Sequence, residues 1–78
     1  MLPLNRDELD QALLNAHARG DRASLITLYE QAGTMAGYDG ADEAAGFYLT
    51  HAYVFALEAG DGRAGELYQR LRAAGKEE

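Results

Sequence analysis

The chain has 78 residues, enough for one domain with a single hydrophobic core. Seven Lys and Arg against thirteen Asp and Glu give a net charge of -6, and such an acidic surface disfavours binding to nucleic acid or to anionic membranes. The hydrophobic content of 47% predicts a packed core, and the absence of cysteine excludes disulfides and thiolate metal sites.

The first predicted helix begins at Asn5 with a capping box. Asn5 and Glu8 have the spacing at which each side chain accepts the other residue's backbone N–H. Leu4 is placed to pack on Leu9 as a hydrophobic staple. Gly20 is expected to end the helix in the left-handed conformation. The apolar face follows helical spacing and comprises Leu9, Ala12, Leu13 and Ala16.

A second helix is predicted after Asp21, which is expected to cap it. This helix should run to the Gly-Tyr-Asp-Gly cluster at residues 37–40, which we interpret as the loop between two halves of the chain. Tyr38 is expected at the surface there. The inner face of the helix comprises Leu25, Leu28, Tyr29, Ala32, Met35 and Ala36.

The third helix is expected to begin near Ala41 or Asp42 and to end at Gly60. Asp39 or Asp42 is its predicted cap. Because this segment is apolar on nearly every side, it should be the central helix, covered by the other three. Asp61 then caps a fourth helix. The inner face of that helix comprises Ala64, Leu67, Tyr68, Leu71 and Ala74.

The two halves of the chain are related by an internal repeat with an offset of forty residues. Five of six matched positions are identical, and alanines at this spacing allow a neighbouring helix to approach closely. We expect the alanine seams of the two halves to meet. The matched pairs are Leu9 and Leu49, Ala12 and Ala52, Leu13 and Tyr53, Ala16 and Ala56, Gly20 and Gly60, and Asp21 and Asp61.

This repeat resembles the tetratricopeptide helical hairpin. The units are residues 5–37 and 40–75 of a single domain, 1–78. The first supplies Leu9, Ala12, Ala16, Gly20, Leu25, Tyr29 and Ala32, and the second Leu49, Ala52, Ala56, Gly60, Ala64, Tyr68 and Leu71. Leu13 and Tyr53 stand where the family usually has glycine. The fold is therefore predicted to be all-α, with two antiparallel hairpins in a right-handed stack or a compact four-helix bundle.

The resemblance implies a function as a non-catalytic protein–protein interaction module. In such arrays the first helices of the hairpins line a face that holds a peptide or partner helix. The corresponding residues are Asp10, Leu14, His17, Phe47, Thr50, His51, Val54 and Leu57. The apolar members are equally expected to complete the core. The hydrophobicity of the third helix also suggests a homodimer formed through it.

Other functional classes receive little support from the residues. His17 and His51 lie in different helices without carboxylates at ligand spacing, so no metal, cofactor or catalytic site is predicted. Ser24 opens a helix as the modified serine of an acyl carrier does, which leaves an acidic carrier or small-ligand bundle as the alternative. Ala23 stands where that motif has aspartate.

Two further expectations concern location and the tyrosines. The longest apolar run, residues 44–59, contains Thr50, His51 and Glu58 and is too short to span a bilayer. The N-terminal segment becomes acidic too early for a signal peptide, so a cytoplasmic protein is expected. Tyr29 and Tyr68 should be core residues, whereas Tyr48 should be at the surface.

Overall fold

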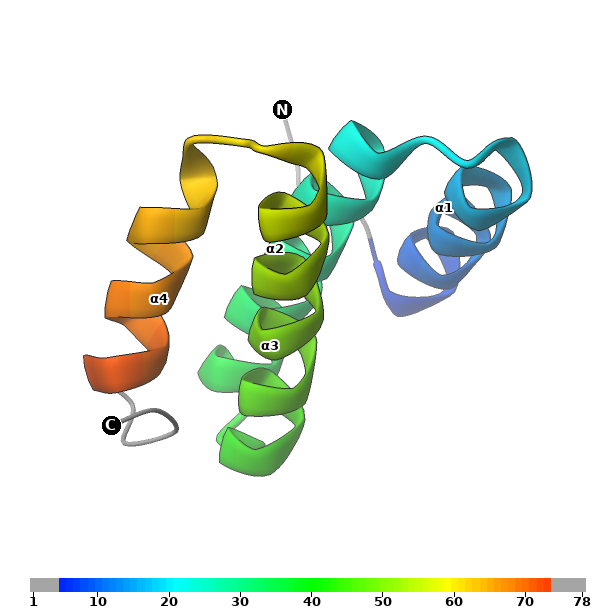
Figure 1. Cartoon of the computed structure of the whole chain (residues 1–78). Helices are drawn as coiled ribbons and strands as arrows, with labels where there is room; N and C mark the ends of the chain where they lie inside the picture. The colour runs from blue at the N-terminus through cyan, green and yellow to red at the C-terminus, as the bar shows by residue number, and fades with distance from the viewer. Residues whose placement is uncertain (1–4, 74–78) are drawn as a thin grey trace.

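The computed structural model describes residues 5–73, without the side chain of Arg6, and confirms the predicted all-α fold. Four helices follow one another: α1 (Arg6–Arg19), α2 (Arg22–Tyr38), α3 (Asp42–Ala59) and α4 (Arg63–Ala73). No strand occurs within residues 5–73. The α2–α3 pair forms the middle of the molecule, with α1 on one side and α4 on the other (Figure 1).

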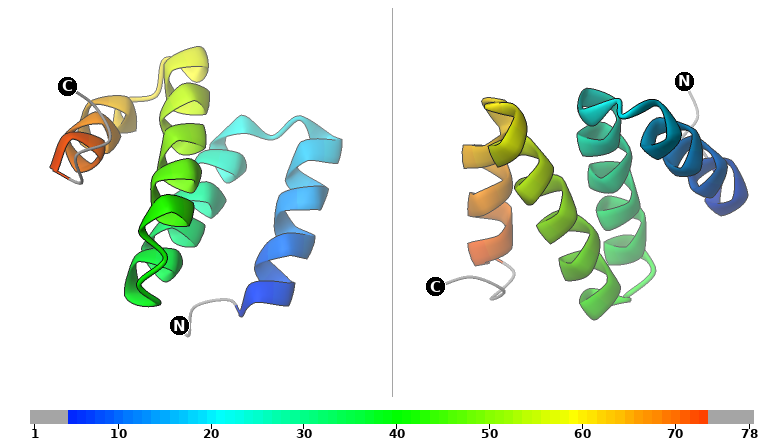
Figure 2. Two further views of the ribbon diagram at one scale, coloured as in Figure 1. Left: turned by 90° about the horizontal axis from the view of Figure 1, so that it is seen from below. Right: turned by 45° about the vertical axis from the view of Figure 1, so that its right-hand side comes forward.

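The four helices form an open array in which each helix packs on the next one in the sequence. No Cα of α1 comes within 8 Å of a Cα of α3 or α4 in the described chain. A compact bundle would bring α1 against α4, so that alternative is not formed (Figure 2). The expectation that the other three helices cover α3 is also wrong, because Phe47, Val54 and Leu57 of this helix are exposed.

Small residues bring α2 and α3 close together. A Cβ atom added to the buried Gly33 would lie 2.9 Å from Leu49 Cγ and 3.4 Å from the Ala45 carbonyl oxygen. The other small residues buried in these two helices are Ala32, Ala36, Gly46, Ala52 and Ala56. The closest seam therefore lies between α2 and α3, and not between the alanine faces of the two hairpins' first helices.

The main core joins α2, α3 and α4. Ile26, Leu67 and Leu71 are its largest fully buried side chains, and they pack with Leu49, Ala52 and Ala56. Tyr29 and Tyr68, expected in the core, are half-buried, as is Tyr48, and Tyr29 packs against the core cluster. Tyr38 is 88% exposed, as predicted. The predicted positions of Leu4 and Ala74 lie outside the described residues.

The two predicted Gly–Asp helix endings are confirmed, although α4 begins one residue further from its Asp61 than α2 does from Asp21. Gly20 and Gly60 are left-handed, with φ of 66° and 65°. The N–H of Asp21 donates to the Ala16 carbonyl at 3.0 Å, and that of Asp61 donates to the Ala56 carbonyl at 2.9 Å. The repeat in sequence thus encodes a repeated helix ending. The capping box of Asn5 and Glu8 is also present.

The turn between α2 and α3 differs from the prediction. Gly37 and Tyr38 belong to α2, and the cap of α3 is Ala41, without a side-chain hydrogen bond. The Ala41 N–H donates to the Ala36 carbonyl at 2.9 Å, so the ending of α2 leads directly into α3. Neither Asp39 nor Asp42 is the cap. Asp42 instead lies in the first turn of α3, where the helix dipole favours a carboxylate.

The carboxylates in the two Gly–Asp turns have lowered pKa values. Hydrogen bonds from the Ser24 hydroxyl, at 2.7 Å, and the Ser24 N–H lower the pKa of Asp21 from its usual 3.8. The pKa of Asp61 is likewise lowered by hydrogen bonds from the Arg63 guanidinium and from the Arg63 backbone N–H, which lies 2.9 Å away. Because each pKa is lower in the folded protein, the ionised carboxylate stabilises the fold fully at pH values above the unfolded-state pKa. This stabilisation is lost as the pH falls through the folded-state pKa.

We therefore expect the free energy of unfolding to decrease on acidification from about pH 5 to below about pH 3. The Asp21→Asn, Asp61→Asn double variant should lose less stability over this interval, because asparagine does not titrate there. Urea denaturation followed by circular dichroism at several pH values measures the difference. Parallel pH profiles for the two proteins would contradict the assignment of the acid sensitivity to these turns.

Candidate functional site

A cavity of about 160 Å³, lined mostly by apolar residues, lies between α1, α2 and the start of α3. The term α1–α3 groove denotes this cavity together with the adjoining cluster of rings. Figure 2 shows α1 diverging from α2 away from their connecting turn, and the cavity lies toward this divergent end. Its walls include Leu9, Leu13, Met35, Ala44 and Tyr48. Asp10 also lines it and is exposed to solvent.

A cluster of rings joins α1 to α3 at the other end of the groove. Tyr29 of α2 lies at its centre, with ring centroids 5.9 Å from His17, 5.2 Å from His51 and 5.8 Å from Phe55. His17 also contacts Phe55 edge-on at 5.9 Å. Aromatic pairs of this kind contribute about 0.5–1.5 kcal/mol each beyond area burial. The cluster therefore holds the C-terminal end of α1 near α3.

Polar atoms in the ring cluster form specific hydrogen bonds. His17 Nε2 and the Tyr29 hydroxyl are 2.9 Å apart. Burial raises the pKa of Tyr29, and the nearby Tyr48 adds to the effect, so the phenol stays neutral at physiological pH. His51 Nδ1 lies 2.9 Å from the Phe47 carbonyl oxygen, which can only accept, so Nδ1 carries the proton. The orientation of both histidines is thus fixed by the fold.

Part of the predicted partner-binding set comes together at this groove. Asp10 lines the cavity, while His17 and His51 both contact Tyr29. Phe47 covers His51, with ring centroids 4.3 Å apart, and remains 57% exposed. Leu14 is 62% exposed and lies on the face of α1 that carries Asp10 and His17, by helical spacing.

The remaining predicted residues lie on a different stripe of α3. Thr50, Val54 and Leu57 are roughly a third of a turn away from Tyr48, His51 and Phe55, since each residue advances the helix by about 100°. Val54 is 44% exposed and Leu57 is 55% exposed. The expectation that Phe47, Val54 and Leu57 simply complete the core is therefore wrong. We call Thr50, Val54 and Leu57 the outer stripe.

The sequence did not identify several residues as part of a groove, namely Leu13, Met35, Ala44 and Phe55, and it predicted Tyr48 only as a surface residue. Leu13 and Met35 were assigned wholly to the packing faces, yet both are half-buried and line the cavity. One signal was available. Tyr48, His51 and Phe55 have the spacing of a single helical stripe, distinct from the outer stripe.

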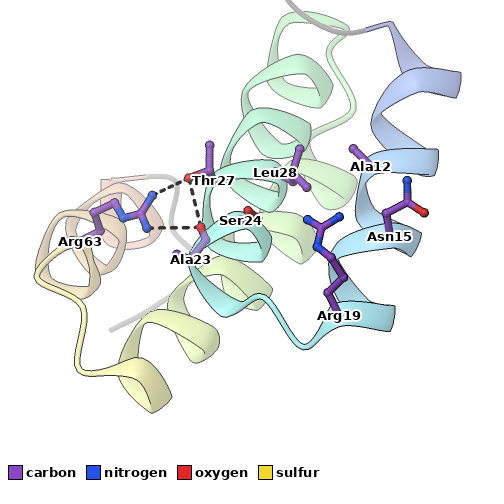
Figure 3. Close-up of a pocket in the computed structure, with 8 residues that line it drawn as sticks. All are labelled: Ala12, Asn15, Arg19, Ala23, Ser24, Thr27, Leu28 and Arg63. Atoms are coloured by element: carbon purple, nitrogen blue, oxygen red, sulfur yellow. Dashed lines mark hydrogen bonds between the residues drawn. The ribbon is translucent and has the colours of Figure 1, made fainter.

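A second depression, on another side of the α1–α2 pair, has several polar side chains among its lining residues (Figure 3). Arg63 crosses from α4 and donates to the Thr27 hydroxyl at 2.7 Å and to the Ala23 carbonyl at 3.4 Å. Ser24, the residue of the carrier alternative, is half-buried, and its hydroxyl donates to Asp21. Arg19 also lines this depression. Its polar groups are thus largely engaged with one another.

A third depression, between α2, α3 and α4, also contains a basic side chain. Arg70 lines it and donates to Glu30 at 3.3 Å and to Thr34 at 3.1 Å. By contrast, Asp10 is the only charged residue that lines the α1–α3 cavity among the residues described. Asp10 also has no hydrogen-bond or ion-pair partner there. Most residues that line the cavity are therefore apolar, and Asp10 is the acidic residue at its edge.

Two kinds of site are not found within residues 5–73. No group of three or more histidine and carboxylate side chains is arranged to hold a metal ion in this part of the chain. None of its helices combines the length and the apolar character needed to cross a bilayer. In comparisons with known proteins, no family model, curated protein or solved structure matches the chain.

Proposed function

We propose that the protein is a non-catalytic interaction module of the cytoplasm that binds a helical segment of a partner protein in the α1–α3 groove. One observation carries the proposal. The Cα atoms of α1 and α3 stay more than 8 Å apart, and both helices pack on α2. Apolar side chains line the space between α1 and α3. A groove of this kind suits an amphipathic helix, whose apolar face covers such side chains.

The exposed side chains beside the groove support the same function. Leu14 on α1 and Phe47 on α3 are both more than half exposed, on the two helices that border it. Covering half of such a side chain contributes about 1 kcal/mol through the hydrophobic effect. Tyr29 and His51 add polar atoms that are held in fixed positions, which favours specificity over general adhesion.

The competing surface is the outer stripe, through which a second copy of the chain would bind. Its residues, Thr50, Val54 and Leu57, recur at intervals of four and three residues, which is the spacing of a coiled-coil seam. The two surfaces lie on the same helix. A pair of glutamine substitutions on α3 therefore distinguishes them without a change in charge.

Peptides selected from a displayed library of helical sequences should bind the wild-type chain. Ala44→Gln should weaken their binding by about tenfold or more, because the longer polar side chain fills the cavity. Val54→Gln, on the outer stripe, should change the affinity by less than about twofold. Fluorescence anisotropy measures both affinities, and circular dichroism confirms that the variants are folded. Failure to select any peptide, or greater sensitivity to Val54→Gln than to Ala44→Gln, would refute the groove as the binding site.

A further inference from the structure

The charge of the α1–α3 cavity points to the chemistry of the partner. The cavity volume of about 160 Å³ is close to that of one large side chain, since engineered apolar cavities of about 150 Å³ hold one benzene molecule. Its walls are aliphatic and aromatic, from Leu9, Leu13, Met35 and Tyr48. A single carboxylate, that of Asp10, stands at its exposed edge.

Three arginines with described side chains line other depressions. Arg19 and Arg63 line the second depression and pair with Asp21 and Asp61 at 3.4 and 3.0 Å. Arg70 lines the third depression and pairs with Glu30. Within the described part of the chain, Asp10 has none of these arginines as its partner. None of these three arginines neutralises the Asp10 carboxylate, which lies at the exposed edge of the cavity.

We infer that the groove takes a basic amphipathic helix and that one Lys or Arg side chain of this helix enters the cavity. The aliphatic stem of a Lys or Arg packs on apolar walls while its charged head stays near water, and the cavity offers both environments. The stem contacts Leu13 and Met35, and the head reaches Asp10. The Tyr48 ring is a further surface on which a cation is attracted. This inference rests on the proposed function and names its partner class.

The first test uses three synthetic helices that differ only in charge. One is built of leucine, glutamine and lysine, with the lysines beside the leucine face. Its two twins carry glutamine or glutamate in place of every lysine. We expect the lysine peptide to bind wild type about tenfold more tightly than the glutamine twin, because a charged hydrogen bond forms at Asp10. Equal affinity for these two peptides would overturn the inference.

Two variants show whether the preference arises at Asp10. Asp10→Asn should abolish most of the lysine preference, whereas Glu66→Gln, which removes an exposed carboxylate on α4, should leave it within about twofold. Asp10→Lys should reverse the preference in favour of the glutamate twin. An equal loss in Asp10→Asn and Glu66→Gln would mean general attraction to an acidic protein and would overturn the inference.

Failure of the inference is distinguishable from failure of the proposed function. If the glutamine twin binds and Ala44→Gln abolishes its binding, the groove is the site whatever the charge preference. The charge inference alone is then overturned if Asp10→Asn has no effect. If Ala44→Gln leaves the affinity of all three peptides unchanged, the groove is not the site, and both proposals are overturned.

Discussion

Replacing Ile26 with alanine is expected to lower the free energy of unfolding by about 3 kcal/mol. Ile26 is fully buried and packs in the cluster that joins α2, α3 and α4, so the substitution removes buried methyl groups and leaves a cavity. A domain of this size has little stability to lose, so much of the population should unfold at moderate temperature. Urea denaturation monitored by circular dichroism measures the change.

The matched control is Leu14→Ala, which removes a comparable side chain from α1. Leu14 is 62% exposed, so the free energy of unfolding should change by less than about 0.5 kcal/mol. Equal destabilisation by the two substitutions would show that the core is not where this structure places it.

Gly33→Val is expected to destabilise the protein by about 2 kcal/mol. The reason is the close approach of α2 to α3, because even a Cβ atom at this position would meet Leu49 Cγ at 2.9 Å. Leu49 is itself buried and has little room to move away. Thermal unfolding by calorimetry should show a lower transition temperature for the variant than for wild type.

The control for this prediction lies one turn further along the same helix. An added Cβ at Gly37 has no neighbour within 4 Å, so Gly37→Ala should stabilise the protein by about 0.5–1 kcal/mol through helix propensity. If Gly33→Val were as well tolerated as Gly37→Ala, the α2–α3 seam would not be close-packed at this point.

The helix ends were predictable from the sequence because they depend on residues close together in the chain. The pairs Asn5 with Glu8 and Gly20 with Asp21 determine hydrogen bonds within a few residues, and the structure contains them as expected. The turn after α2 was less predictable. Gly37 is compatible with helix when the left-handed residue is Gly40, three positions later.

The packing partners of each helix were not predictable in the same way. The apolar sequence of α3 indicates burial, but it does not specify which helix covers which side. Gly33 was not identified as the point of closest approach, because its role depends on Leu49 and Ala45 in another helix. The same limit applies to the groove, whose aromatic centre, Tyr29, had been assigned to the core.

The order of the helices in the array has a consequence for how the chain folds. Because backbone packing joins only helices that are consecutive in sequence, native contacts form mainly between neighbouring segments, with no long loop to close first. Chains of low contact order fold in microseconds to milliseconds, so we expect this chain to fold on that timescale.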